Sequence, residues 1–129
     1  MYISNILNSS LKILILFLPI SIILGNFIIN LNSALIVILF FGIILINKKI
    51  LITYKNFFII LCILFLLLFL NIIGSSDKYL SIKGALGIVR YYLLFVAILY
   101  SFENFVNFKY KFSHIIFFVI LFVTFDLFY

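Results

Sequence analysis

The sequence predicts an all-α fold: a polytopic transmembrane helical bundle of about five helices. Hydrophobic residues make up 68% of the 129 residues and charged residues only 9%, and the charges fall in short clusters between long apolar runs. A soluble domain is about half apolar, with about a quarter of its residues charged. In lipid, every backbone polar group must be satisfied within its own segment, so runs of this kind are expected to be helices.

The apolar runs indicate a single transmembrane domain over residues 1–129. A helix needs roughly 20 residues to cross a hydrocarbon core of ~30 Å. The first run contains Pro19 and Gly25, where we expect a kink or break. A short polar turn with Asn26, Asn30, Asn32 and Ser33 is expected to separate the first two runs. The expected spans are residues 13–29, 33–46, 57–73, 85–102 and 115–129.

The first and last runs bear on where the protein begins and ends. Lys12 precedes the first run, but no small-residue cleavage site follows, so we interpret this run as a retained span and not a signal peptide. The last run, residues 115–129, gives only about 22 Å of helix. We therefore expect the chain to be a fragment of a larger bundle, with the remainder of the full-length chain as its partner.

The net charge of +6 comes from lysines that flank the apolar runs and from one arginine. This placement predicts contact with membrane lipids and no binding of nucleic acid, which requires a basic patch on a soluble fold. With a cytoplasmic amino terminus, two lysines would face outward, Lys78 and Lys83. Six would face inward: Lys12, Lys48, Lys49, Lys55, Lys109 and Lys111. The excess of inside lysines predicts that orientation.

The segment over residues 81–92 is the most specific stretch of the chain. Lys83 and Arg90 are seven residues apart, so they share one face of a helix, two turns apart. Gly84 and Gly87 lie between them and would let another backbone or a ligand come close. Arg90 would lie about five residues into the fourth span, roughly 8 Å below the outer edge of the membrane.

Arg90 has two interpretations. Its guanidinium presents a rigid fork of donors that matches phosphate, so it predicts an anion site facing the outer surface. Alternatively, Arg90 extends to the interface and only anchors the helix. Asp126 lies at a similar depth in the last run and is a candidate ion-pair partner of Arg90. That pair could itself be purely structural.

Other chemistry is not indicated by the sequence. Neither His114 nor Cys62 has a second His or Cys at ligand spacing, so no metal site is expected. Cys62 also cannot form a disulfide within the chain. There is no glycine-rich phosphate loop of a nucleotide enzyme, and no cofactor is expected.

Three short motifs carry a resemblance to a known family. They are residues 18–21 (Leu-Pro-Ile-Ser), residues 84–92 with Arg90, and the acidic-aromatic residues 125–129. With these motifs the chain resembles the amino-terminal part of bacterial O-antigen ligase and O-antigen polymerase-like membrane proteins. The resemblance covers most of the 129 residues.

The resemblance implies a multi-pass glycosyltransferase of the bacterial inner membrane, active in lipopolysaccharide or other polysaccharide biosynthesis. Such enzymes transfer a glycan from undecaprenyl-pyrophosphate on the periplasmic side and need no nucleotide sugar. Arg90 and Lys83 would then bind the carrier pyrophosphate and stabilise charge on the leaving group. Catalytic residues are not assigned. The family's larger periplasmic loop is absent from this chain, so we expect this piece alone to be inactive.

Two alternatives stay open at this point. The chain could be a fragment of a membrane transporter or flippase, with Arg90 and Asp126 in a substrate or proton path. It could also be a small structural membrane protein without catalysis. The glycan, its acceptor and the choice between ligase and polymerase stay open as well. The downstream DNA would separate a fragment from a small complete protein.

Overall fold

The computed structural model describes the backbone of residues 2–128 and the side chains of residues 4–125. This part of the chain contains six α-helices and no β-strand, which confirms the predicted all-α fold. Five of the helices are long and apolar enough to cross a membrane. The helices are α1 (Tyr2–Leu24), α2 (Asn26–Ile46), α3 (Lys49–Thr53), α4 (Lys55–Gly74), α5 (Lys78–Asn104) and α6 (Phe108–Phe128).

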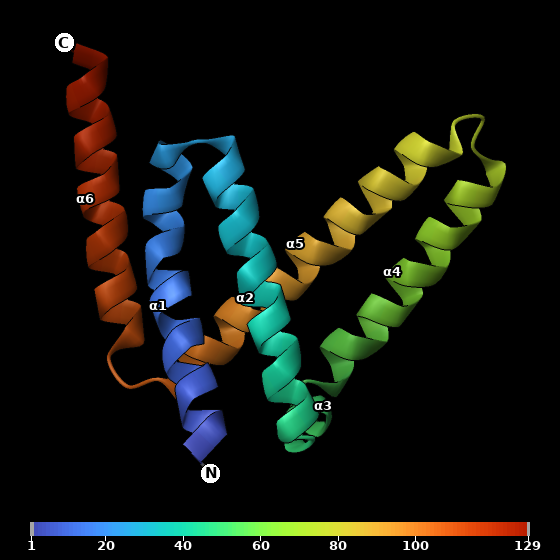
Figure 1. Ribbon diagram of the computed structural model, residues 1–129, viewed down its shortest axis with the longest axis horizontal. Coiled ribbons are helices and arrows are strands. Elements are labelled where there is room, and N and C mark those ends of the chain that lie inside the picture. Colours follow the sequence, from blue (N-terminus) through green and yellow to red (C-terminus); the bar gives the residue numbers. More distant parts are fainter. Residues whose placement is uncertain (1, 129) are drawn as a thin grey trace.

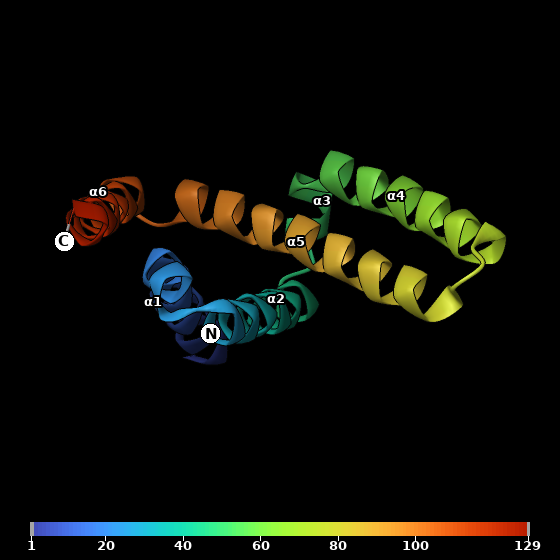
Figure 2. The same cartoon turned by 90° about the horizontal axis from the view of Figure 1, so that it is seen from above.

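The long helices run alternately up and down (Figure 1). Helices α1 and α2 form a closely packed antiparallel pair, α6 packs on α1, and α5 packs on α2 and α4. Figure 2 shows that α5 passes behind the α1–α2 pair and carries α4 away from it. One end of the bundle, here called the amino-terminal side, holds the start of α1, the α2–α4 connection and the α5–α6 connection. The opposite side holds the α1–α2 turn and the α4–α5 loop.

The turn between the first two helices lies at Gly25, and not over residues 26–33 as we expected. The φ angle of Gly25 is 107°, which glycine adopts without the strain a side chain would cause, so one residue is enough to reverse the chain. Asn26, Asn30 and Ser33 consequently fall within the first turns of α2. The break that we expected in the first run is therefore confirmed at Gly25, whereas helix α1 continues through Pro19 without a break.

Polar residues account for the boundaries of α5. The Asp77 carboxylate accepts a hydrogen bond from the backbone N–H of Leu80 (3.1 Å), which caps the start of the helix. The helix therefore begins at Lys78, before the apolar run that predicted it. After its end, Asn107 adopts a φ of 58°, a left-handed conformation that asparagine tolerates better than most residues. Helix α6 begins one residue later.

The buried core lies toward the amino-terminal side. The Tyr100 ring of α5 contacts Phe40 of α2, Tyr54 before α4 and Phe105 after α5, with ring centroids 5.6–6.3 Å apart. The short helix α3, which the sequence analysis did not predict, adds the buried Ile50. The buried hydrophobic residues are Leu11, Ile15, Ile36, Phe40, Ile43, Ile44, Ile50, Tyr54, Val96, Ala97, Tyr100 and Phe108.

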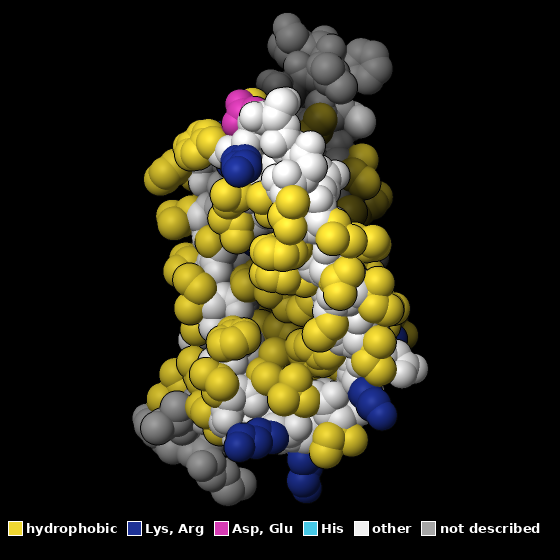
Figure 3. Space-filling model, turned by 90° about the vertical axis from the view of Figure 1, so that its right-hand side faces the viewer, with side chains coloured by type: hydrophobic (Ala, Val, Ile, Leu, Met, Phe, Trp, Pro, Cys, Tyr) yellow, Lys and Arg dark blue, Asp and Glu magenta, His cyan; other side chains and the backbone are white. Residues whose placement is uncertain are grey.

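Helix α4 has no buried residue and presents apolar side chains almost all round. In water this exposure would be costly, but lipid tails are as apolar as leucine. Figure 3 shows the same pattern over one face of the molecule: apolar side chains fill the middle, and most Lys and Arg side chains lie at the amino-terminal side. The surface is thus compatible with a multi-pass membrane protein.

Candidate functional site

Arg90 lies on the first half of α5 and reaches across to α2. Its Nη2 donates to the Oδ1 of Asn30 (2.8 Å) and to the hydroxyl oxygen of Tyr91 (3.0 Å). Its Cζ lies 4.8 Å from the centroid of the Tyr91 ring, within the range of a cation–π contact. The partly buried guanidinium is therefore held in one place by a neutral amide, a neutral hydroxyl and an aromatic face.

The contact with Asn30 locates the guanidinium along the membrane direction. Asn30 is four residues after Asn26, the first residue of α2, which is roughly 6 Å of helix rise. Asn30 also donates from Nδ2 to the backbone carbonyl of Asn26 (2.7 Å). The Arg90 side chain therefore lies close to the end of α2 that is on the opposite side of the bundle.

Part of the guanidinium has no partner among the described residues. The two Nη2 contacts account for both hydrogens of that nitrogen. The Nε atom is buried without an acceptor in the described part of the chain, and Nη1 makes no hydrogen bond there. Buried donors usually have partners, and an unpaired one is costly. Arg90 thus presents a full positive charge, and Nη1 is the donor that an added acceptor could meet.

Lys83 and the two glycines leave the neighbouring surface of α5 open. Lys83 is exposed, two turns before Arg90 on the same helix. A Cβ placed on Gly84 or Gly87 would meet nothing within 4 Å. In the described structure these glycines therefore do not serve a close helix–helix approach. They border open surface between two cations.

The predicted partner Asp126 cannot be assigned to this site. Helix α6 packs on α1. In Figures 1 and 2 the carboxyl-terminal end of α6 and the first half of α5 lie toward opposite edges of the molecule. The side chain of Asp126 lies outside the described residues, so the Arg90–Asp126 ion pair stays a prediction. The partner that the structure does give to Arg90 is Asn30.

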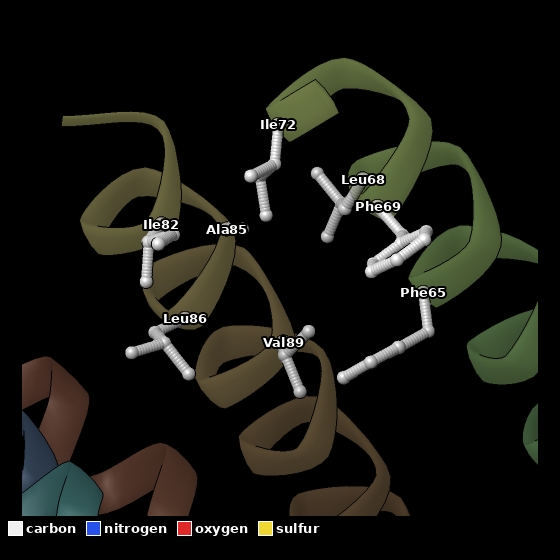
Figure 4. Close-up of a pocket in the computed structure, with 8 residues that line it drawn as sticks. All are labelled: Phe65, Leu68, Phe69, Ile72, Ile82, Ala85, Leu86 and Val89. Carbon is white, nitrogen blue, oxygen red and sulfur yellow. The ribbon is translucent and has the colours of Figure 1, made fainter. Parts of the chain in front are cut away.

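An apolar cavity of about 220 Å³ lies between α4 and α5, beside this site. Figure 4 shows side chains from both helices turned toward it. Leu86 lines the cavity and is four residues before Arg90, so the two are neighbours on the helix surface. All lining residues are apolar: Phe65, Leu68, Phe69, Ile72, Ile82, Ala85, Leu86 and Val89. A charged face and an apolar cavity therefore occupy adjacent surfaces of α5.

A second polar cluster lies at the amino-terminal side. The Tyr54 hydroxyl donates to the carboxylate of Glu103, which belongs to the last turn of α5. Burial raises the pKa of Tyr54 above its usual value, and the Glu103 hydrogen bond and charge raise it further. The side chains border a cavity of about 200 Å³. This cluster joins the start of α4 to the end of α5.

Sequence reasoning missed Asn30 and Tyr54 for different reasons. Asn30 was assigned to a turn because asparagine favours turns, and only the sharp turn at Gly25 brings it into α2. Tyr54 and Glu103 are 49 residues apart, and no local pattern relates them. For Asn30 a signal existed: an asparagine inside a span is a candidate for hydrogen bonding between helices.

The metal-binding residue types are scattered in this fold. His114 is exposed on α6, and its Nδ1 lies 2.7 Å from the carbonyl oxygen of Tyr110. Cys62 is exposed on α4. Over residues 4–125, no three His, Cys, Asp or Glu side chains come together as a metal site would require.

The fold and the site define a class of protein. It is an all-α chain whose five long helices are compatible with a multi-pass membrane protein, with the Arg90 cation hydrogen-bonded near one end of α2. Comparisons of the chain with protein families, with curated proteins and with solved structures find no match.

Proposed function

We propose that the chain is the amino-terminal part of a bacterial inner-membrane glycosyltransferase that resembles O-antigen ligases. In this proposal Arg90 and Lys83 bind the pyrophosphate of an undecaprenyl-pyrophosphate-linked glycan on the periplasmic side. The observation that carries the proposal is Arg90: its guanidinium is hydrogen-bonded to neutral partners, has donors without a partner among the described residues, and lies close to one end of α2. A pyrophosphate supplies the acceptors and the negative charge that this group lacks.

The surroundings of Arg90 support a lipid-linked anion. Lys83 adds a second cation two turns away, and Gly84 and Gly87 leave room between the two. The apolar cavity beside Leu86 could receive part of an isoprenoid chain while the pyrophosphate contacts Arg90. A water-soluble anion would have no use for that apolar surface. In transfer, Arg90 would stabilise the charge that develops on the departing pyrophosphate.

Substitution of Arg90 tests the proposal. Arg90→Ala removes a charge-assisted contact worth on the order of 1.5–3 kcal/mol, which corresponds to a roughly tenfold to hundredfold loss in transfer rate. Arg90→Lys keeps the charge but loses the planar guanidinium that Asn30 and Tyr91 hold, so it should weaken transfer less. The measurement is lipopolysaccharide laddering in a ligase-null strain complemented with each variant of the full-length protein.

Lys78→Ala is the matched control. Lys78 is an exposed cation at the start of the same helix, and its replacement removes the same charge from the same side of the bundle. Wild-type ladders are expected for Lys78→Ala at equal membrane abundance. If Arg90→Ala also restores wild-type ladders, Arg90 is only an anchor and the carrier-binding role is wrong. The 129-residue piece expressed alone should give no ladders.

A further inference from the structure

We infer that Asn30 is a positioning residue for Arg90: its neutral amide fixes the guanidinium while leaving the full positive charge available to a pyrophosphate. This inference rests on the proposed function and adds a residue from α2 to the site. It concerns a residue that does not need to touch the ligand itself.

The orientation of the Asn30 amide is fixed from both ends. Its Nδ2 donates to the backbone carbonyl of Asn26 at 2.7 Å, so its Oδ1 is the atom that points away from that carbonyl. That Oδ1 accepts from Nη2 of Arg90 at 2.8 Å. A backbone carbonyl cannot donate, so the amide cannot be reversed without losing both hydrogen bonds. The first turn of α2 therefore fixes the Asn30 amide, and the amide in turn fixes the position of the guanidinium.

The choice of an amide matters for the charge. A carboxylate at position 30 would hold Arg90 in the same place, but it would form an ion pair and compete with any anion. An amide oxygen accepts the hydrogen bond without cancelling the charge. With Nη2 engaged by Asn30 and Tyr91, the unpaired Nη1 is the group left to meet an added ligand. Fixing the side chain beforehand also lowers the entropy lost on binding.

Three observations separate this arrangement from an ordinary packing contact. Asn30 is exposed, so the fold does not need its side chain to fill the core. The contact joins residues 60 apart in the sequence and bridges α2 to the half of α5 that carries no buried residue. The buried residues of α5, by contrast, are Val96, Ala97, Tyr100 and Ser101 in its second half.

Binding of farnesyl pyrophosphate to the full-length protein in phosphatidylcholine nanodiscs tests the inference. Asn30→Ala should weaken binding by roughly tenfold, because Arg90 loses its orienting partner. Asn30→Asp should weaken it more than Asn30→Ala does, since the carboxylate pairs with Arg90. A role in packing alone predicts the reverse order, because Asp is nearly isosteric with Asn and keeps the acceptor. Farnesol, which lacks the pyrophosphate, should bind all variants equally.

A double-substitution cycle with Arg90→Ala completes the test. If Asn30 acts through Arg90, Asn30→Ala should not change the affinity further in the Arg90→Ala background. The inference is overturned if Asn30→Asp binds as tightly as Asn30→Ala, or if Asn30→Ala still weakens binding without Arg90. If Arg90→Ala alone leaves the affinity unchanged, the proposed function fails as well, so the two failures can be told apart.

Discussion

At the scale of single residues, the chain pairs the Arg90 cation of its fourth apolar run with neutral groups. Arg90 contacts the Asn30 amide and the Tyr91 hydroxyl and ring among the described residues. A charge buried without compensation is costly in a membrane, and such residues commonly mark functional sites. Hydrogen bonds to neutral oxygens reduce this cost without neutralising the group. The arrangement therefore suits a cation that must stay available to a ligand.

Tyr54 gives a prediction for pH dependence at the same scale. Burial and Glu103 raise the folded-state pKa of Tyr54 above its usual value. The protonated hydroxyl therefore contributes its full stabilisation below pH ~10, and this stabilisation is lost as the pH rises through the folded-state pKa. Below that pH, Tyr54→Phe should be less stable than wild type by about 1 kcal/mol, because the hydrogen bond to Glu103 is lost. The difference in stability between wild type and Tyr54→Phe should become smaller at higher pH. Unfolding in mixed micelles, followed by circular dichroism, measures it.

Wild type and Tyr54→Phe share every other ionisable group, so only the difference in stability between the two proteins is informative. If the difference in stability between the two proteins stays constant as the pH rises above ~10, the hydrogen bond donated by the Tyr54 hydroxyl does not stabilise the fold.

At the scale of elements, α5 consists of two parts with different roles. Its second half packs Val96, Ala97 and Tyr100 into the core, whereas its first half carries Arg90 and borders the apolar cavity. The Tyr92 hydroxyl, between these halves, donates to the backbone carbonyl of Phe57 at 2.8 Å and ties α5 to α4. The site is therefore built on a helix whose far end is anchored, which favours precise placement of Arg90.

The turn at Gly25 should be sensitive to any side chain. Nothing lies within 4 Å of a Cβ placed there, so the cost of Gly25→Ala is purely conformational and comes from the φ of +107°. We expect a loss of about 1–3 kcal/mol. Equilibrium unfolding in mixed micelles measures this loss.

Gly74→Ala is the matched control for that prediction. Gly74 is the last residue of α4, has equally open surroundings and does not have a positive φ. Alanine should be tolerated there, with a neutral effect or a gain of up to ~1 kcal/mol from its higher helix propensity. Equal losses from both substitutions would mean that the backbone at Gly25 is not the cause.

At the scale of the whole molecule, the alternating direction of the helices places most of the lysines on one side of the bundle. The α2–α4 and α5–α6 connections lie on the amino-terminal side, together with Lys48, Lys49, Lys55, Lys109 and Lys111 at or near them. Lys12 lies at the same level, with its Nζ 5.9 Å from the centroid of the Phe105 ring in the α5–α6 connection. Lys78 and Lys83 lie toward the opposite side, at the start of α5.

This distribution predicts a cytoplasmic amino-terminal side. In a Cys62→Ser background, a cysteine at position 78 should react with a membrane-impermeant maleimide in intact cells. A cysteine at position 49 should react only after permeabilisation. The reverse pattern would move Arg90 to the cytoplasmic half of the membrane and rule out a periplasmic carrier site.

The sequence by itself determined the class of fold and the approximate positions of the five long helices, and it singled out Arg90 as a candidate site residue. Composition and apolar run length suffice for the first two, because a bilayer admits few ways to satisfy the backbone. A single arginine inside an apolar run stands out for the same energetic reason. The expected spans over residues 57–73 and 85–102 both fall inside observed helices, α4 and α5.

Only the tertiary structure decided which residues surround Arg90. The place of Asn30 depends on the φ of Gly25, a single backbone angle that no apolar pattern encodes. The contact between α2 and α5 depends on how helices pack. Exposed and packed helix surfaces are both rich in apolar side chains in this chain, so periodicity does not distinguish them. The same holds for α4, which is apolar all round. Contacts between residues far apart in the sequence are set by packing geometry, and packing becomes visible only in three dimensions.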